Sequence, residues 1–219
     1  IGGADPDANP RLRLAIAKAK AVSLPRDNLE RAIKKGAGTL DGENVEEIRY
    51  EGYGPGGVAI IVECLSDNRN RTAAEVRYAF SKRDLTMGSS GSATHSFNRV
   101  GQVTVTAEGT DEEELLLAAM EHGADDLLHD SDPETGADVF MVTCEVPVLE
   151  GLREGLEAAS FPVNDYGLHW LPTVVVPLEG RDAEKLLDLI DVLEELDDVG
   201  DVYANHEISD EELERIAES

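Results

Sequence analysis

The amino-acid sequence of 219 residues predicts an α+β protein with three domains. Apolar residues recur at helical spacing near the N-terminus and form strand-like runs further along the chain. Polar stretches that contain glycine separate these segments. We expect a small basic all-helical domain at 1–40 and two ferredoxin-like α/β domains. The first α/β domain is discontinuous, at 45–101 plus 178–219, and the other, at 102–177, is inserted into it.

Two helices are expected in the first domain, at 10–22 and 25–35. In each helix, apolar residues recur three, four or seven positions apart and therefore share one face. Pro25 suits a first helical turn, where its missing N–H costs nothing, and Gly36 suits a helix end. The residues expected to face inward are Leu12, Ile16 and Ala19 in the first helix and Leu29, Ala32 and Ile33 in the second.

The second domain is expected to begin after a polar linker at 39–44. A turn with four glycines and one proline, at 52–57, separates two strand-like runs. It resembles a phosphate cradle but lacks the Gly-Lys-Ser/Thr end and does not lead into a helix. The expected elements are, in order, strands at 48–51 and 58–65, a helix at 72–83 capped by 67–71, a flexible small-residue loop at 85–92, and strands at 95–97 and 101–106.

From residue 102 onward the expected order is β-α-β-β-α-β, the split-βαβ order of a ferredoxin-like domain. A further helix and strand then supply what the second domain lacks, which is why we expect the third to be inserted into it. The elements are strands at 103–105, 125–128, 139–146 and 168–177, helices at 111–121 and 148–159, then the returning helix at 182–196, a strand at 199–204 and a short acidic tail.

The charge is unevenly distributed along the chain. The formal net charge is −27, which by itself opposes binding to a polyanion. Residues 1–99, however, hold 15 Lys and Arg against 13 Asp and Glu, whereas 100–219 hold 4 against 33. The N-terminal part can therefore face an anion while the C-terminal part stays away from it.

Other classes of protein find little support. None of the five histidines has a neighbouring Cys or a His at i+4, and an acidic turn at 130–136 has its glycine one place too late for a calcium loop. We expect no metal, cofactor, small-molecule substrate or catalysis. Cys64 and Cys144 are expected to be buried reduced thiols, and no run approaches the roughly 18 apolar residues of a membrane span. These features indicate a cytoplasmic protein without a membrane partner.

Lys and Arg side chains gathered on one surface can dock on phosphates. The candidate nucleic-acid-binding residues are Arg11, Arg13, Lys18, Lys20, Arg26, Arg31, Lys34, Lys35, Arg69, Arg71, Arg77, Lys82 and Arg83. A loop that could reach a partner comprises Gly88, Ser89, Ser90, Gly91 and Ser92. Aromatic residues are 5% of the chain, so stacking on several unpaired bases is not the expected main mode.

Four contiguous segments resemble the YebC/PmpR family: DPDANPRL (5–12), PRDNLERAIKKG (25–36), YEGYGPGG (50–57) and DNRNRTAAEVR (67–77). The resemblance implies a basic helical domain and two α/β domains around an open cleft, in a cytosolic bacterial protein or an organelle relative. It implies a regulator, since family members are labelled probable transcriptional regulators that bind DNA. Relatives are also implicated in translation on the ribosome, including relief of stalling at proline runs.

Two ligands therefore stay open, DNA and ribosomal RNA. No major-groove reader is recognisable, and a highly acidic body suits a shaped site entered from one side, so the physical argument favours RNA on the ribosome. The alternative is a protein-interaction module whose acidic half binds a basic partner. An enzyme in the cleft between domains is the weakest hypothesis.

Overall fold

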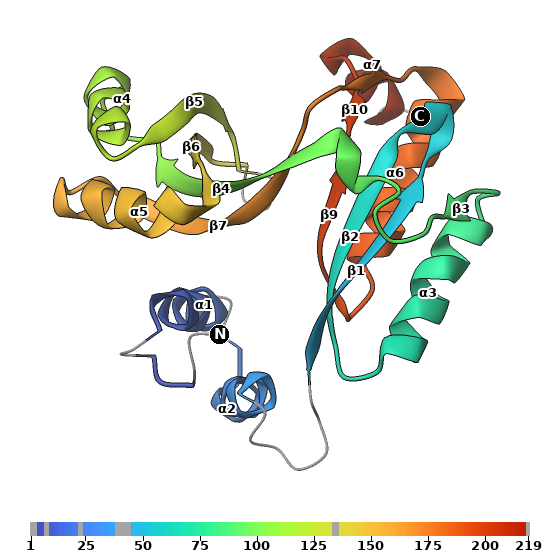
Figure 1. The fold of residues 1–219 in the computed structure, drawn as a ribbon, viewed down its shortest axis with the longest axis horizontal. Coiled ribbons are helices and arrows are strands. Elements are labelled where there is room, and N and C mark those ends of the chain that lie inside the picture. Colours follow the sequence, from blue (N-terminus) through green and yellow to red (C-terminus); the bar gives the residue numbers. More distant parts are fainter. Residues whose placement is uncertain (1–3, 7–8, 22–23, 38–44, 133–135, 218–219) are drawn as a thin grey trace. The chain divides into compact units, whose positions relative to one another are not determined.

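The computed structural model describes all residues except 1–3, 7–8, 22–23, 38–44, 133–135 and 218–219. It confirms the α+β class, with helices and two four-stranded sheets built from antiparallel pairs (Figure 1). The chain divides into two compact units: unit 1 is 1–98 with 172–219, and unit 2 is 99–171. The linker expected at 39–44 lies outside the described residues.

The two N-terminal helices form where the sequence predicts them, as α1 (Pro10–Ala21) and α2 (Arg26–Gly36). Asn9 Oδ1 accepts a hydrogen bond from the Leu12 N–H at 3.1 Å, which satisfies one donor at the start of α1. Pro25 lies just before α2 rather than inside its first turn. Of the residues expected to face inward, Leu12, Ile16, Ala19, Leu29 and Ile33 are half-buried, whereas Ala32, at the flank of its stripe, is exposed.

A four-stranded sheet and two covering helices form the hydrophobic core of unit 1. The elements are β1 (Glu46–Tyr53), β2 (Ala59–Ser66), α3 (Arg69–Ser81), β3 (Thr86–Met87), α6 (Gly180–Glu194) and β9 (Val199–Ala204). The strand order is β3-β1-β2-β9, so the β1–β2 hairpin lies at the centre. Its turn places Gly56 and Gly57 at φ of +64° and +84°, where a Cβ would be strained. Phe80 and Leu186 are among the fully buried residues between sheet and helices.

Three sequence-based assignments in unit 1 and at its junction with unit 2 are wrong. The strand expected at 168–177 is interrupted, because Pro172 has no N–H to continue the ladder, and only β8 (Val176–Pro177) follows. Residues Thr94–Ser96 form a 3-10 turn instead of the start of a strand. The acidic tail contains β10 (His206–Glu207), which pairs with β8, and α7 (Asp210–Ala217). The carboxylates in the first turn of α7 stabilise the helix, because they lie at the positive end of its dipole.

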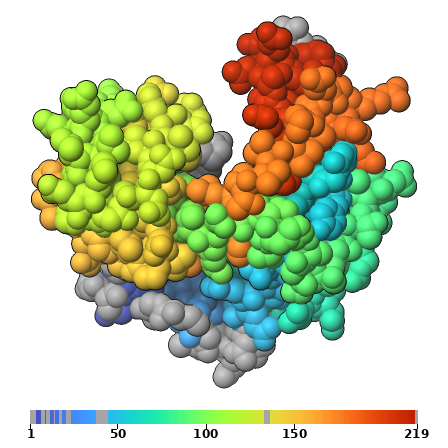
Figure 2. Space-filling view, turned by 45° about the horizontal axis from the view of Figure 1, so that its top comes forward, coloured from blue at the N-terminus to red at the C-terminus, as the bar shows by residue number. Residues whose placement is uncertain are grey.

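Unit 2 has the predicted split-βαβ arrangement, with strand order β5-β6-β4-β7. Its elements are β4 (Phe97–Thr106), α4 (Glu112–Glu121), β5 (Ala124–Ser131), β6 (Asp138–Cys144), α5 (Leu149–Ala158) and β7 (Val163–Pro172). Leu115 and Leu152 are fully buried in its core. The expected strand at 139–146 ends earlier, and Val146–Val148 is a 3-10 turn because Pro147 cannot donate. Figure 2 shows α4 and β5, in light green, at the surface of this unit.

Both cysteines are buried and free, as the sequence predicts. Burial in the core of unit 1 raises the pKa of the Cys64 thiol to about 12, and burial also raises the pKa of Cys144. Both side chains therefore serve as small apolar core residues. Within the described part of the chain, no helix has the length and apolar character needed to cross a membrane.

Candidate nucleic-acid interface

Helix α3 carries most of the candidate cations of unit 1 outside the N-terminal helices. It begins at an Asn68 cap, whose Oδ1 accepts from the Arg71 N–H at 3.2 Å. Val76 and Phe80 lie on the buried face toward the sheet. The opposite face is left to polar and charged side chains, as the period of 3.6 residues requires.

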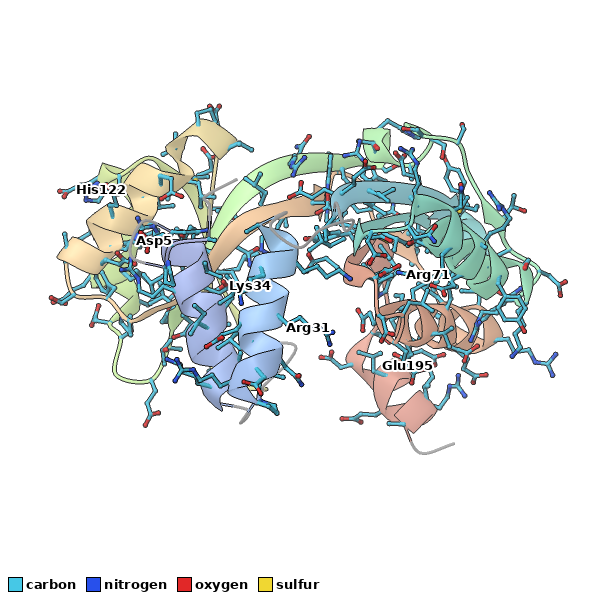
Figure 3. All side chains as sticks on the ribbon, turned by 90° about the horizontal axis from the view of Figure 1, so that it is seen from below. Asp5, Arg31, Lys34, Arg71, His122 and Glu195 are labelled. Atoms are coloured by element: carbon cyan, nitrogen blue, oxygen red, sulfur yellow. The ribbon has the colours of Figure 1, made fainter. Side chains whose placement is uncertain are left out.

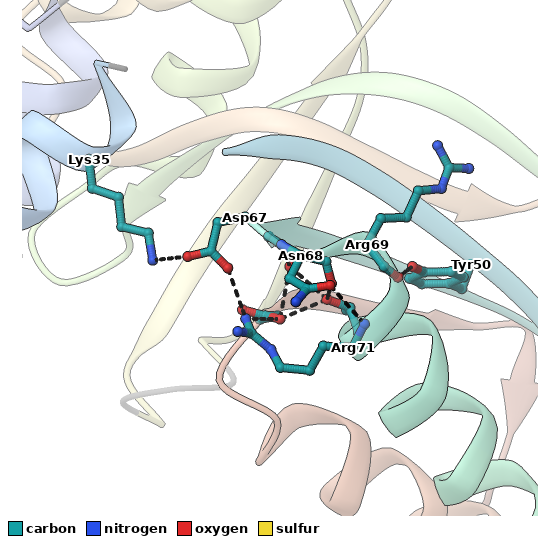
Figure 4. Close-up of polar contacts among 9 residues, drawn as sticks. Lys35, Tyr50, Asp67, Asn68, Arg69 and Arg71 are labelled. Carbon is teal, nitrogen blue, oxygen red and sulfur yellow. Dashed lines mark hydrogen bonds and ion pairs between the residues drawn. The ribbon is translucent and has the colours of Figure 1, made fainter. Parts of the chain in front are cut away.

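Arg71 at the start of α3 is held by two carboxylates (Figure 4). Its Nη2 lies 2.7 Å from Asp198 Oδ2 and 3.2 Å from Asp67 Oδ1. Asp67 also accepts from Lys35 Nζ at 2.7 Å, which connects the end of α2 to the start of α3. Asp198 accepts in addition from the hydroxyls of Thr72 and Ser66. Two of the predicted phosphate-binding cations, Arg71 and Lys35, are thus already neutralised within the protein.

These contacts shift the pKa of both carboxyls. The hydrogen bond from Lys35 is the largest influence on Asp67 and lowers its pKa. For Asp198, burial acts to raise the pKa, but hydrogen bonds from Arg71, Thr72 and Ser66 outweigh it and hold the pKa below its ordinary value. Both groups therefore favour the charged state in which they bind Arg71.

Arg83 is compensated in a similar way. Its Nε lies 2.6 Å from Asp188 Oδ2 on α6, and its side chain is only 11% exposed. One of its terminal nitrogens also donates to the Ala79 carbonyl. The hydrogen bond from Arg83 is the main reason that the pKa of Asp188 is lowered. This arginine joins α3 to α6 and contributes little to the outer surface.

The remaining candidates divide by exposure. Arg26 forms an exposed ion pair with Glu30 at 2.9 Å, an arrangement that is weak in water. Arg31 and Lys34 lie on the exposed side of α2 (Figure 3). The side chains of Arg11 and Lys18 lie outside the described residues. The other exposed candidates are Arg13, Lys20, Arg69, Arg77 and Lys82.

Tyr78 is a surface residue that sequence reasoning missed. Its side chain is 64% exposed on the outer face of α3, next to Arg77 in the chain. Lys82 Nζ lies 5.8 Å from the centre of its ring, within the range of a cation–π contact. The Tyr–Lys spacing of four residues on a predicted helix was the available signal. The low aromatic content of the whole chain had argued against a role for aromatic side chains, so Tyr78 was not considered.

The small-residue loop after β3 is tied to the sheet by Glu51. This carboxylate on β1 is fully buried, and it accepts from the N–H groups of Gly91, Ala93 and Thr94 at 2.7, 2.7 and 2.9 Å. The Tyr53 hydroxyl also donates to the Ser92 carbonyl. We expected a flexible loop from composition. Four hydrogen bonds instead fix the backbone of the end of this loop and of the two residues that follow it.

The fixed backbone leaves only part of the loop available to a partner. Ser89, Ser90 and Gly91 are exposed, whereas Gly88 and Ser92 are half-buried. Burial acts to raise the pKa of Glu51, but the backbone hydrogen bonds from Gly91, Ala93 and Thr94 outweigh it and hold the pKa below its usual value. The sequence offers no local signal for this anchor, since the same strand also carries Glu46, Glu47 and Arg49.

Unit 2 offers a different surface. It contains 17 Asp and Glu against two arginines, a net charge of −15. Arg153 is buried against Glu150, Glu154 and Glu157, and Arg99 lies over the Trp170 ring. Across the ranges that the structure describes, no group of three or more His, Cys, Asp or Glu is placed to hold a metal ion.

The fold and the site define a mixed α/β protein with a cationic helix surface in one unit and an acidic second unit. Residues 1–39 match the TACO1/YebC protein N-terminal domain, and 45–206 match the TACO1/YebC second and third domain. The chain therefore belongs to the TACO1/YebC family.

Relatives support this membership over nearly the whole chain. A probable transcriptional regulatory protein of Geobacter sulfurreducens is 47% identical, covering 99% of this chain and 85% of the relative. A protein of the same description from Pseudomonas syringae pv. syringae is 49% identical, covering 98% and 84%. The crystal structure of a conserved hypothetical protein from Aquifex aeolicus aligns with a TM-score of 0.81 at 44% identity, over 95% of this chain and 84% of that one.

Proposed function

We propose that this protein is a non-catalytic regulator that docks on the phosphate backbone of nucleic acid through the cationic side chains of unit 1. One observation carries the proposal: the cations of α3 and of the two residues that follow it, Lys82 and Arg83, divide into two sets. Arg71 and Arg83 are held by carboxylates, whereas Arg77 and Lys82 are exposed on either side of Tyr78. The exposed set is suited to contact phosphates, since neither Arg77 nor Lys82 forms an ion pair within the described part of the chain.

Tyr78 adds a second kind of contact to this surface. An exposed aromatic ring between two cations can stack on an unpaired base or pack on a sugar while the cations bind phosphates. The exposed Arg13, Lys20 and Arg31 on the N-terminal helices supply further positive charge in unit 1. Unit 2 and residues 172–219 of unit 1 are acidic and are repelled by the same polyanion, so the protein approaches nucleic acid with the N-terminal part of unit 1.

Duplex DNA and ribosomal RNA present the same phosphate chemistry. The names of the relatives support DNA and transcription. Structured RNA on the ribosome is supported by the exposed tyrosine between two cations, which can stack on an unpaired base. It is also supported by the position of the exposed candidate cations in unit 1, which suits a binding site that the protein enters from one side. We therefore propose that the protein acts in regulation by binding one of these two, with the cations of unit 1 serving in either case.

Co-sedimentation with ribosomes across a salt series, with excess random duplex DNA as competitor, distinguishes the two ligands. Retention on ribosomes despite the DNA supports a role in translation. Transfer to the DNA at equal salt supports a role in transcription. Absence of binding to both at low salt contradicts the proposed function.

A further inference from the structure

Helix α4 of unit 2 has apolar side chains on two opposite faces. Leu115 and Ala119 are fully buried against the core. On the other side Leu116, Leu117 and Met120 are 40%, 66% and 63% exposed. Met120 lies four positions after Leu116 and three after Leu117, spacings that adjoin on a helix surface, so these three side chains form one outer strip. Packing within the unit requires only the buried face.

The surroundings of this outer strip are acidic. Asp111 caps α4, Glu112 and Glu113 lie in its first turn, and Glu121 ends it, all exposed. The unit has no lysine. Its two arginines lie elsewhere: Arg153 is buried among three glutamates and Arg99 contacts Trp170. The strip is therefore an apolar surface with a carboxylate rim and no cation in it.

We propose that the outer strip of α4 is a docking surface for a basic amphipathic segment of a partner protein. Leu117 and Met120 are the anchors, because they expose the largest apolar fractions and methionine adapts to differently shaped partners. The carboxylate rim pairs with Lys and Arg that flank the apolar residues of the partner and speeds association. The proposal is independent of the nucleic-acid surface on unit 1.

Charge excludes the other occupants. Nucleic acid and anionic lipid surfaces are both negative, so a unit with a net charge of −15 repels them. A second copy that used the same strip would bring two glutamate rims together, since a two-fold interface places like surfaces opposite each other. A protein segment with positive charge at the rim and apolar side chains at the centre satisfies both parts of the surface.

The test measures binding of two synthetic peptides to the full chain by fluorescence anisotropy. One peptide has leucines at i, i+3, i+4 and i+7 with lysines elsewhere, and the other keeps the lysines but replaces the leucines with glutamine. We expect the leucine peptide to bind at least about tenfold tighter, a factor that corresponds to a well-buried apolar anchor. The variant Leu117→Gln/Met120→Gln should reduce its affinity to that of the glutamine peptide.

Leu128→Gln is the matched control, because Leu128 is 56% exposed on β5 of the same unit. It should leave both affinities unchanged. Equal affinity of the two peptides, or equal weakening by Leu128→Gln, would overturn the proposal, since either result means general attraction to acidic surface. A dimer of the wild-type chain in sedimentation that Leu117→Gln/Met120→Gln dissociates would also overturn it.

A second readout does not depend on the folding of any variant. Amide chemical-shift mapping of the wild-type chain with the leucine peptide should place the largest shifts in Glu112–Glu121. Largest shifts in another element would contradict the assignment of the strip.

Discussion

Glu51 shows how one buried charge can shape a surface loop. Its carboxylate receives three backbone N–H groups, from Gly91, Ala93 and Thr94. We predict that Glu51→Gln lowers the free energy of unfolding by about 2–3 kcal/mol, since the amide loses the charge and directs an NH2 group at donors. Urea denaturation measures the loss, and hydrogen exchange should accelerate at these three amides.

Glu47→Gln is the control, because Glu47 lies on the same strand and is exposed. It should change stability by less than about 0.5 kcal/mol. If the two variants were equally stable, the bonds to Glu51 would not be holding the loop.

The same carboxylate, together with Asp198, predicts a loss of stability in acid. Both pKa values are lowered in the folded chain, so the unfolded chain binds protons first as the pH falls. The stabilisation is complete above the ordinary carboxyl values of 4.5 and 3.8, and it is lost as the pH falls through the lowered folded values. Unfolding free energy measured against pH should therefore fall below about pH 4.5, and Glu51→Gln should flatten that fall. An unchanged slope in the variant would remove Glu51 from this account.

At the scale of elements, the contact between β1 and α3 depends on a glycine. A Cβ on Gly52 would lie 2.5 Å from Cε1 and 2.7 Å from Cζ of Phe80, whose side chain is buried in the core. We predict that Gly52→Ala lowers the free energy of unfolding by about 1–3 kcal/mol. Gly200→Ala on β9, whose nearest atom would be 3.8 Å away, should stay within about 0.5 kcal/mol. Thermal or urea denaturation of both variants measures the difference in stability. Equal stability would contradict the prediction and would mean that α3 shifts to accept the methyl group.

Most elements could be predicted from the sequence because helices and strands follow short-range patterns. The helices at 72–83 and 182–196, for example, correspond to α3 and α6 within a few residues. The interruption after Pro172 and the helix α7 were missed. In α7 the apolar residues are few, and the helix depends on its capped acidic first turn rather than on a long apolar stripe.

The charge of the candidate site could be predicted from the sequence, but the ion pairs that neutralise some of its cations could not. Arg71 and Arg77 look alike in the sequence, and both lie on one helix. Only the fold shows that Asp198, 127 residues away in the chain, neutralises Arg71. The strand order of unit 1, which returns β9 to the central hairpin, brings these two groups together. Long-range partners of this kind leave no local signal.

For the whole molecule, both units are net acidic, −12 in unit 1 and −15 in unit 2, and the candidate cations are confined to residues 11–83 of unit 1. The exposed candidate cations lie on the N-terminal helices and at α3, and unit 2 holds an acidic surface with an apolar strip. A protein arranged in this way could bind nucleic acid and a basic protein at once, because the two partners prefer opposite charges. The docking of nucleic acid on the exposed cations of α3 is the central claim.

The salt dependence of binding tests that claim most directly. Affinity for a short duplex DNA and for a ribosomal RNA fragment is measured from low to high salt for the wild type and for Arg77→Gln/Lys82→Gln. Each phosphate contact contributes about 0.9 to the slope of log affinity against log salt on duplex DNA, so the double variant should lose about 1.8.

The charge-matched control is Arg181→Gln/Lys185→Gln on α6, which removes two cations from the same unit. It should keep the wild-type slope for both nucleic acids. A reduced slope only in Arg77→Gln/Lys82→Gln, with unchanged thermal stability, is the result that this account predicts. Equal slopes in the two double variants would contradict it, because binding would then follow net charge and not the exposed face of α3.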